Sequence, residues 1–304
     1  MFVPGVIPRG LRFGASVTWG RSKRRLQSRR NLGRLSQPFI QVLVAELVSS
    51  SASSRPSHER VFSSSANGLS SGSSTIEASV HGLLEVIERD AVSFHYVKDQ
   101  TQPIRLATLP NALSAVVDAA RVANIDLSLR SVPNELGIPV FASLLVDRSS
   151  QGRGFIAIGT GCHVDPVAAA VRAVTEAAEA RVSFISGNGH GRNFEELYRT
   201  LDSSGDIRDV PAYQDSLRLI IDDKAAIDFQ DVRVPCEHVA SVDEAWEFLM
   251  KRLQQYGFGQ VCRVVYTPPE SPIQVVRIVV PRMEFLNKTL RRAGPRLKQF
   301  LQSQ

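Results

Sequence analysis

The stretch SSGSSTIEASVHGLLEVIERDA, residues 70–91, decides the fold because it predicts a long helix entered from a serine- and glycine-rich turn. Ser74 followed by Glu77 fits a capping box, in which the serine oxygen accepts a first-turn N–H and the glutamate returns to the N–H of the cap residue. At about 100° per residue, one side of this helix is apolar and should be buried. That side carries Ile76, Val80, Leu83, Leu84, Val86 and Ile87.

The opposite side of the same helix is acidic. Glu77, His81, Glu85 and Glu88 fall within roughly 80° of arc, and Arg89 lies beside them. Like charges one turn apart repel, whereas ordinary solvated faces mix signs. Two interpretations stay open: a solvated acidic face, or carboxylates that bind a divalent cation such as Mg²⁺ together with substrate phosphates.

A second stretch, GTGCHVDPVAAAVRAVTEAAEAR at residues 159–181, predicts another helix. Asp165 serves as its N-cap and Pro166 occupies its first position. Its expected apolar face consists of Val167, Val171, Val174, Ala178, Val182 and Ile185. Its polar face carries Arg172, Glu176 and Glu179. The spacing of the first two allows a simple ion pair.

The remaining pattern predicts an α+β or mixed α/β fold with antiparallel sheets flanked by helices. Residues 49–74 are serine-rich and are expected to be loop. The expected strands are residues 125–133, 138–147, 152–163, 218–222, 262–267 and 275–281. The expected further helices are residues 113–125, with Val116, Val117, Ala120 and Val122 apolar, and residues 243–257.

Composition limits the class of protein. The 304 residues are 43% hydrophobic and 22% charged, which is typical of a soluble globular chain, and no apolar run has the length of a membrane span. Cys162, Cys236 and Cys262 have no CxxC spacing, which favours the reducing cytoplasm and disfavours structural zinc. The sequence contains neither GxxxxGK[ST] nor GxGxxG, so a nucleotide would need another kind of site.

The positive charge is concentrated at the N-terminus. Residues 1–45 hold nine Lys or Arg and no acid, so the remainder carries −3 of the total charge of +6. Such a segment fits a nucleic-acid arm, a transit segment or a poorly ordered tail. Sparse aromatic interleaving disfavours nucleic-acid binding. We expect a basic, poorly ordered segment at residues 1–43, poorly packed to about residue 36, and a domain at residues 44–304.

Both quoted stretches carry a family resemblance. Residues 64–91, SSANGLSSGSSTIEASVHGLLEVIERDA, are similar to the SNG-x-A-x-G-N-T-x-x-E-A block and E-x-x-E-R helix of the YcaO family. Residues 159–181 resemble its G-x-H-x-D-P block and the following R-A-x-x-E-A-x-Q-x-R helix. Smaller similarities extend the resemblance from Val44 to Glu284. It implies a YcaO-like fold with ATP and Mg²⁺ as cofactors.

The resemblance assigns residues to each cofactor. The implied metal ligands are Glu85 and Glu88. The implied ATP-binding residues are Ser70, Ser73, Glu77, Arg89, Arg172, Glu176 and Arg181. On this reading the acidic face lacks lysines because its counter-charge is a bound cation, and Arg89 presents a fork to phosphate.

Some positions depart from the family pattern. Ala66 replaces a frequent serine, Ser73 replaces asparagine, and Glu179 replaces glutamine. Glu179 adds an anion that must pair with Arg181 or turn outward when ATP is bound. The family's earlier block, S-G-K-G followed by an S-x-x-x-E-x-x-E-R helix, has no counterpart before Val44. A truncated reading, a mis-started reading and a natural variant stay open, and we expect this chain alone to bind Mg·ATP weakly with slow or no turnover.

The implied activity is ATP-dependent phosphorylation of a peptide backbone amide, for cyclodehydration or thioamidation in peptide modification. The GPR at 294–296 resembles the subgroup found beside TfuA-type partners and linked to thioamide formation. The implied partners are a peptide or protein substrate, a TfuA-like or leader-peptide-binding protein, and a second copy in a homodimer. The alternatives are a non-catalytic YcaO-like scaffold and a nucleic-acid binder.

The resemblance also has geometric consequences. The helix from about Thr75 to Tyr96 should turn Glu85 and Glu88 into a cleft. The helix that begins near Asp165 should bring Glu176 or Arg172 to the same cavity.

Overall fold

The computed structural model describes residues 65–147, 156–185, 226–232, 239–286 and 293–303, together with the strand Thr18–Trp19. The chain divides into two compact units. The first combines Met1–Leu83 with Phe258–Pro281, and the second combines Leu84–Gly257 with Arg282–Gln304. The boundary falls inside helix α2 (Thr75–Val97), so each unit contains one part of this helix.

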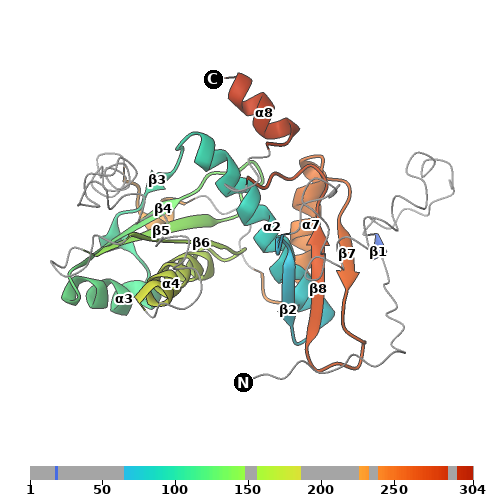
Figure 1. Ribbon diagram of the computed structural model, residues 1–304, viewed down its shortest axis with the longest axis horizontal. Helices are drawn as coiled ribbons and strands as arrows, with labels where there is room; N and C mark the ends of the chain where they lie inside the picture. Colours follow the sequence, from blue (N-terminus) through green and yellow to red (C-terminus); the bar gives the residue numbers. More distant parts are fainter. Residues whose placement is uncertain are drawn as a thin grey trace, which may run out of the picture. The chain divides into compact units, whose positions relative to one another are not determined.

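The first unit contains a four-stranded antiparallel sheet in the order β1-β7-β8-β2 (Figure 1). The strands are β1 (Thr18–Trp19), β7 (Cys262–Val265), β8 (Gln274–Val279) and β2 (Leu69–Gly72). Of residues 1–36, the structure describes only β1, at the sheet edge. The rest of the basic segment, for which poor packing was expected, lies outside the described residues.

Strand β2 shows that the expectation of loop throughout residues 49–74 is wrong. Its sequence LSSG is poorly suited to a strand by propensity. The register nevertheless pairs Leu69 with Arg277 and Gly72 with Gln274 of β8. The strand therefore depends on its partner, which a local composition pattern does not reveal.

The start of α2 has the expected cap with one difference. The Ser74 hydroxyl oxygen accepts the N–H of Glu77 at 3.2 Å, as in a capping box. The Glu77 carboxylate accepts the N–H and the hydroxyl of Ser73, at 2.7 and 2.5 Å, and not the N–H of Ser74. The Glu77 carboxylate thus bonds to the residue before the cap, whereas the motif predicts a bond to the cap residue itself.

A glycine allows α2 to lie against β2. A Cβ atom on Gly82 would lie 2.6 Å from the Ser70 hydroxyl oxygen and 2.7 Å from the Gly68 carbonyl oxygen. The Ser70 hydroxyl donates to the carbonyl of Ala78 at 2.6 Å. The side chain of Ser70 therefore bonds directly to the helix backbone, at a distance that a residue larger than glycine at position 82 would not permit.

The second unit contains another four-stranded antiparallel sheet, in the order β3-β4-β5-β6 (Figure 1). Its strands are β3 (Gln102–Pro103), β4 (Ile125–Ser131), β5 (Val140–Asp147) and β6 (Ile156–Cys162). Its further helices are α3 (Asn111–Val122), α4 (Pro166–Ile185), α7 (Val242–Gln255) and α8 (Pro295–Gln302), with 3-10 turns η2 (Leu106–Thr108) and η4 (Phe229–Asp231). The predicted fold class of antiparallel sheets flanked by helices is confirmed. The expected strand at residues 218–222 lies outside the described residues.

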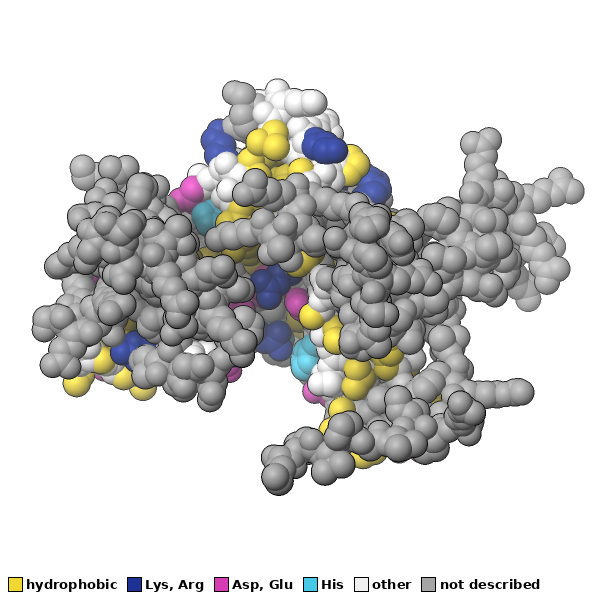
Figure 2. All heavy atoms as spheres, viewed as in Figure 1, with side chains coloured by type: hydrophobic (Ala, Val, Ile, Leu, Met, Phe, Trp, Pro, Cys, Tyr) yellow, Lys and Arg dark blue, Asp and Glu magenta, His cyan; other side chains and the backbone are white. Residues whose placement is uncertain are grey.

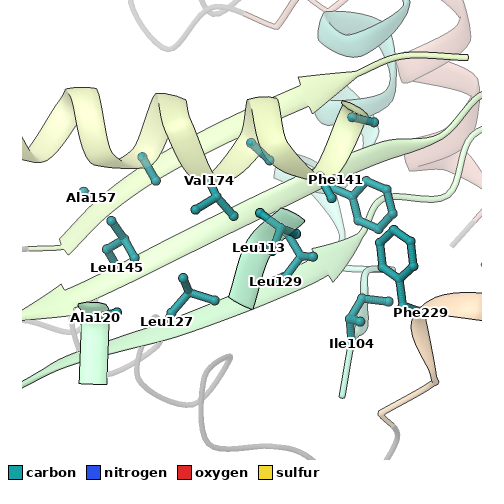
Figure 3. Close-up of a cluster of buried hydrophobic side chains, with 14 of the residues drawn as sticks. Ile104, Leu113, Ala120, Leu127, Leu129, Phe141, Leu145, Ala157, Val174 and Phe229 are labelled. Atoms are coloured by element: carbon teal, nitrogen blue, oxygen red, sulfur yellow. The ribbon is translucent and has the colours of Figure 1, made fainter. Parts of the chain in front are cut away.

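One face of this second sheet is covered by α4 over a hydrophobic core (Figure 3). Leu129 of β4, Phe141 of β5 and Val174 of α4 all belong to this core. The Phe141 ring stacks on the ring of Phe229, with centroids 5.6 Å apart. Helix α3 contributes Leu113 and Ala120, whereas Val116 and Val122 are exposed, contrary to the expected apolar positions.

Helix α4 begins as predicted, and the predicted side chains Val174, Val167, Val171 and Ala178 lie in or against the core, but the centre of the buried face is displaced. Asp165 accepts the N–H of Val167 at 2.9 Å, which confirms the N-cap. The face packed into the core consists of Ala169, Ala170, Ala173, Val174 and Ala177. Val182, expected on the apolar face, is 62% exposed. The valine pattern therefore points to the wrong centre of the buried face.

The cause is strand β6. A Cβ atom on Gly159 would lie 2.2 Å from the backbone nitrogen of Ala177, and one on Gly161 would lie 2.3 Å from the carbonyl oxygen of Ala169. Strand and helix backbones are in near contact at both glycines. An alanine face permits this approach, whereas a valine face would hold the helix away.

A buried ionic network attaches the C-terminal segment to α2. Asp90 is 5% exposed and accepts the N–H of Glu284 at 2.6 Å and the guanidinium of Arg296 at 2.5 Å. Glu284 is 4% exposed and accepts the N–H groups of Gly294, Arg296 and Leu297, so it caps the first turn of α8. Burial raises the pKa of Asp90, and the Arg296 bond and charge oppose that rise.

The surface of the described part carries charges of both signs. On the face seen in Figure 2, Lys or Arg and Asp or Glu side chains both reach the surface among hydrophobic ones. Within the described ranges, no helix is both long and apolar enough to cross a bilayer.

Candidate functional site

Three glutamates of the second unit surround one arginine. The Arg89 Nε atom lies 4.0 Å from a Glu85 carboxylate oxygen and 3.9 Å from one of Glu88. The Arg89 Nη2 atom lies 3.9 Å from a carboxylate oxygen of Glu176. Three carboxylates facing one guanidinium leave an excess of negative charge within this group, which we call the glutamate cluster: Glu85, Glu88, Arg89 and Glu176.

Helix α2 presents three members of the glutamate cluster from one turn. Glu85 and Glu88 are three positions apart and Arg89 follows directly, so their side chains leave the helix on one face. Glu88 is the most deeply placed, at 8% exposed. The opposite face is held by the predicted apolar side chains Val80, Leu83, Leu84 and Ile87, all of which are buried. The two carboxylates therefore do not lie on open convex surface.

Thr160 of β6 connects the glutamates of two helices. Its hydroxyl lies 2.6 Å from a Glu88 carboxylate oxygen and 3.2 Å from one of Glu176. Its backbone N–H donates to the same oxygen of Glu176 at 2.6 Å. Glu176 of α4 and Glu88 of α2 thus meet at one strand residue, and the shared cavity that the resemblance implies for Glu176 stays a prediction.

Arg172 and Arg181 do not share the contacts with Arg89 and Thr160 that bring Glu176 into the glutamate cluster. Arg172 is exposed on α4, and Glu176 pairs with Arg89 and not with Arg172. Arg181 is half-buried, and its Nε atom is inaccessible to solvent. Glu179 is exposed, which meets the condition that this extra anion turn outward. The simple Arg172–Glu176 pair expected from spacing is therefore not formed.

The implied nucleotide residues of the first unit bond to protein groups. The Ser73 hydroxyl and N–H donate to the Glu77 carboxylate, and the Ser70 hydroxyl donates to the carbonyl of Ala78. These bonds from Ser73 hold the pKa of Glu77 below its usual value. His81 lies beside them, with its Nδ1 atom 3.4 Å from the carbonyl oxygen of Ser71. Their part in nucleotide binding stays a prediction, as does the cleft.

Burial controls the chemistry of Glu88. Removal of the carboxylate from water raises its pKa; the Thr160 hydrogen bond and the Arg89 charge oppose the rise, and the other two glutamates add to it. A divalent cation at the carboxylate would favour its ionised form. A bound cation would therefore stabilise the ionised form of Glu88 in its buried environment.

The glutamate cluster fits a magnesium ion that arrives with phosphate. Mg²⁺ is usually held by one or two carboxylates plus waters and substrate phosphates. Glu85 and Glu88 supply such oxygens, half-buried and buried respectively. Across the described ranges, no group of three or more His, Cys, Asp or Glu side chains could hold a metal ion alone. The residues thus fit a metal shared with a nucleotide and do not form a protein-only metal site.

Sequence reasoning missed two residues near the glutamate cluster. Thr160 lies inside the quoted GTG of residues 159–161, and its flanking glycines were the available signal of close packing. Tyr96 lies seven positions after Arg89 and therefore on the same helix face. Tyr96 is 48% exposed; partial burial of its phenol raises the pKa, the charge of Arg89 opposes this rise, and those of Glu176 and Glu88 add to it.

Known proteins are similar to this chain in sequence or in fold. An uncharacterised protein in the tfuA 3′ region of Rhizobium leguminosarum bv. trifolii is 32% identical over 234 residues, which are 73% of this chain and 53% of that protein. YcaO from Methanopyrus kandleri, bound with AMPPCP and Mg²⁺, matches with a TM-score of 0.60 and 22% identity over 78% of this chain and 60% of that chain. A heterocyclase in complex with substrate and cofactor matches with a TM-score of 0.61 and 22% identity over 77% of this chain and 30% of that chain.

These matches differ in what they establish. The two solved structures show a shared fold, and the chain spans about half the length of the Rhizobium protein. A family model described as YcaO cyclodehydratase, ATP- and Mg²⁺-binding, matches residues 41–284. That match covers most of the chain, including both quoted motifs and every member of the glutamate cluster. The chain therefore belongs to the YcaO family, a family that binds ATP and Mg²⁺.

Proposed function

We propose that this protein takes part in the ATP- and Mg²⁺-dependent activation of a peptide backbone amide. The observation that carries the proposal is the glutamate cluster, with three carboxylates and one arginine on two helices held at Thr160. Membership of a family that binds ATP and Mg²⁺ supports it. Likeness in fold to a heterocyclase bound to substrate and cofactor supports a site that holds both.

The proposed reaction has two substitutions. The amide oxygen of the substrate attacks the γ-phosphorus of ATP, and ADP leaves. A nucleophile adds to the amide carbon, and loss of inorganic phosphate completes the substitution. The nucleophile is a Cys, Ser or Thr side chain of the substrate, or an external sulfide. The protein's task is to align these groups and neutralise phosphate charge.

In this proposal the residues have separate roles. Glu85 and Glu88 hold Mg²⁺, which when bound neutralises charge on the phosphates. Arg89 turns from Glu85 and Glu88 to the phosphate oxygens and donates to them, while it keeps its contact with Glu176. Glu176 orients Arg89. The proposed further nucleotide contacts are Ser70, Ser73, Glu77, Arg172 and Arg181.

The product and the partners belong to the same proposal. The GPR at 294–296 and the relative from the tfuA 3′ region support thioamide formation with a TfuA-like partner over azoline formation. An azoline product, a leader-peptide-binding partner and a homodimer are the alternatives. The cysteine usage of the chain supports work in the cytoplasm.

A second candidate is a non-catalytic scaffold that binds a peptide or partner protein. It is favoured by one observation: the hydroxyls of Ser70 and Ser73, which the enzyme proposal assigns to the nucleotide, bond to Ala78 and Glu77. In this reading the fold and the peptide surface persist while Mg·ATP is held weakly. The two candidates differ in whether nucleotide binding depends on Glu85 and Glu88.

The test is calorimetric titration of the protein with ATP in the presence and absence of Mg²⁺. Under the enzyme proposal, Glu88→Gln and Glu85→Gln each weaken Mg·ATP binding at least tenfold, or about 1.4 kcal/mol. Glu247→Gln, on the exposed side of α7, makes the same change of charge away from the glutamate cluster and should leave binding unchanged. Equal binding by the Glu88 and Glu247 variants would remove the enzyme proposal in favour of the scaffold.

A further inference from the structure

We infer that Thr160 is the positioning residue of the magnesium site, because it sets the places of Glu88 and Glu176 relative to each other. The inference rests on the proposed function, in which Glu88 binds the metal. It adds a residue to which the family resemblance above assigns no role.

Each donor of Thr160 has its own acceptor. A threonine hydroxyl has one hydrogen to donate, and Glu88, at 2.6 Å, is its nearer acceptor. Glu176 lies 3.2 Å from that hydroxyl oxygen but 2.6 Å from the backbone nitrogen, so the N–H is its main donor. The hydroxyl therefore fixes Glu88, and the backbone fixes Glu176.

This division makes the side chain specific for Glu88. Any residue other than proline at position 160 would keep an N–H for Glu176, but only serine or threonine would keep a hydroxyl of the right length. Glu88 is buried, and its other close contact within the glutamate cluster is the Arg89 guanidinium at 3.9 Å. Loss of the hydroxyl would leave a buried carboxylate to turn toward Arg89.

Strand β6 holds Thr160 at a fixed distance from α4. Gly159 and Gly161 on either side approach α4 so closely that an added Cβ atom would meet its backbone at 2.2 and 2.3 Å. Thr160 therefore has little freedom to follow a moving carboxylate. A rigid donor is what a metal-binding carboxylate needs, since hydrogen bonds to metal ligands orient them and their loss typically lowers affinity 10- to 100-fold.

The experiment compares three substitutions at position 160 by calorimetric titration with Mg·ATP, with thermal unfolding as the check on folding. Thr160→Val keeps the shape and the N–H but removes the hydroxyl, and it should weaken Mg·ATP binding by roughly 10-fold or more. Thr160→Ser restores the hydroxyl and should bind within about threefold of the unmodified protein, by the same reasoning. If the valine variant does not fold, Thr160→Ala takes its place.

A double-mutant cycle separates positioning from a general structural effect. If Thr160 acts through Glu88, Thr160→Val should have no further effect on Mg·ATP binding in the Glu88→Gln background. Undiminished loss in that background would overturn the inference, as would binding by Thr160→Val equal to that of the unmodified protein. If Glu88→Gln itself binds Mg·ATP normally, the proposed function fails first and the inference fails with it, so the two failures are distinguishable.

Discussion

At the scale of single residues, Cys162 is a buried cysteine whose thiol is affected by the charge of Glu88. It is 1% exposed, and complete burial raises the pKa of its thiol well above the usual value of 9.0. The charge of Glu88 adds to this rise, and that of Arg172 opposes it. Because the thiolate is the reactive form of cysteine, Cys162 is held as an inert thiol. Cys162 is therefore not the nucleophile of the proposed reaction.

We predict that iodoacetamide at pH 7.5 does not modify Cys162 in the folded protein. The reagent needs both access and thiolate, and the structure supplies neither. Mass spectrometry of the peptide that contains Cys162 measures the modified fraction, with protein alkylated in urea as the fully modified reference. Rapid modification before unfolding would contradict the burial described here.

Some residues of the glutamate cluster could be found from sequence and others could not. Glu85, Glu88 and Arg89 follow from helical spacing, because their relation is local. Glu176 required the family resemblance, since spacing alone pairs it with Arg172. Thr160 has no periodic signal, and its role depends on two helices that are distant in sequence meeting at one strand.

At the scale of elements, the contact between β6 and α4 sets the geometry of the glutamate cluster. The core face of α4 is formed chiefly by alanines because Gly159 and Gly161 bring strand and helix together. Sequence reasoning found α4 and its N-cap but centred its buried face on valines. Periodicity identifies the more hydrophobic side, whereas the available space on the partner strand decides which side is buried.

We predict that Gly161→Ala destabilises the protein by about 1–3 kcal/mol, because the new methyl group overpacks the contact and pushes α4 away from β6. Urea unfolding followed by circular dichroism measures the change. Gly259→Ala is the matched control, since its Cβ atom would meet nothing within 4 Å, and it should change stability by less than about 0.5 kcal/mol. Equal effects of the two substitutions would contradict the close approach.

At the scale of the whole molecule, the network of Asp90, Glu284 and Arg296 joins residues that no local pattern connects. Sequence reasoning noted the GPR at 294–296 only as a family cue, yet Arg296 bonds to Asp90 and Glu135 and lies over the Phe94 ring, 5.1 Å from its centroid. Pairings across such sequence distances follow from the completed fold. Contacts between residues so far apart in the chain cannot be predicted from the pattern of a single sequence.

We predict that Arg296→Met lowers the free energy of unfolding at pH 7.5 by about 3–5 kcal/mol, because it leaves the buried Asp90 carboxylate without its counter-charge. The folded-state pKa of Asp90 already lies above its ordinary value of 3.8. Without Arg296 it should rise further, so the folded protein takes up a proton as the pH falls through this raised pKa. The loss of stability should therefore shrink toward acid pH.

The measurement is urea unfolding at pH 7.5 and at mildly acidic pH, each compared with unmodified protein at the same pH. Arg121→Met is the control, because Arg121 pairs with Asp118 on the surface of α3 at 3.3 Å, with side chains 77% and 70% exposed. Such surface pairs contribute about 1 kcal/mol or less. A loss at Arg296 that is small, or equal at both pH values, would show that the network does not stabilise a buried charge.

The same network has a consequence in time. Asp90 and Arg296 are 206 positions apart, and at a synthesis rate of about 5–20 residues per second Arg296 emerges roughly 10–40 s after Asp90. For most of that interval α2 is already made, but neither the N–H of Glu284 nor the guanidinium of Arg296 exists for Asp90 to accept from. The second part of α2 therefore acquires its native surroundings late in biosynthesis, although it precedes most of the chain.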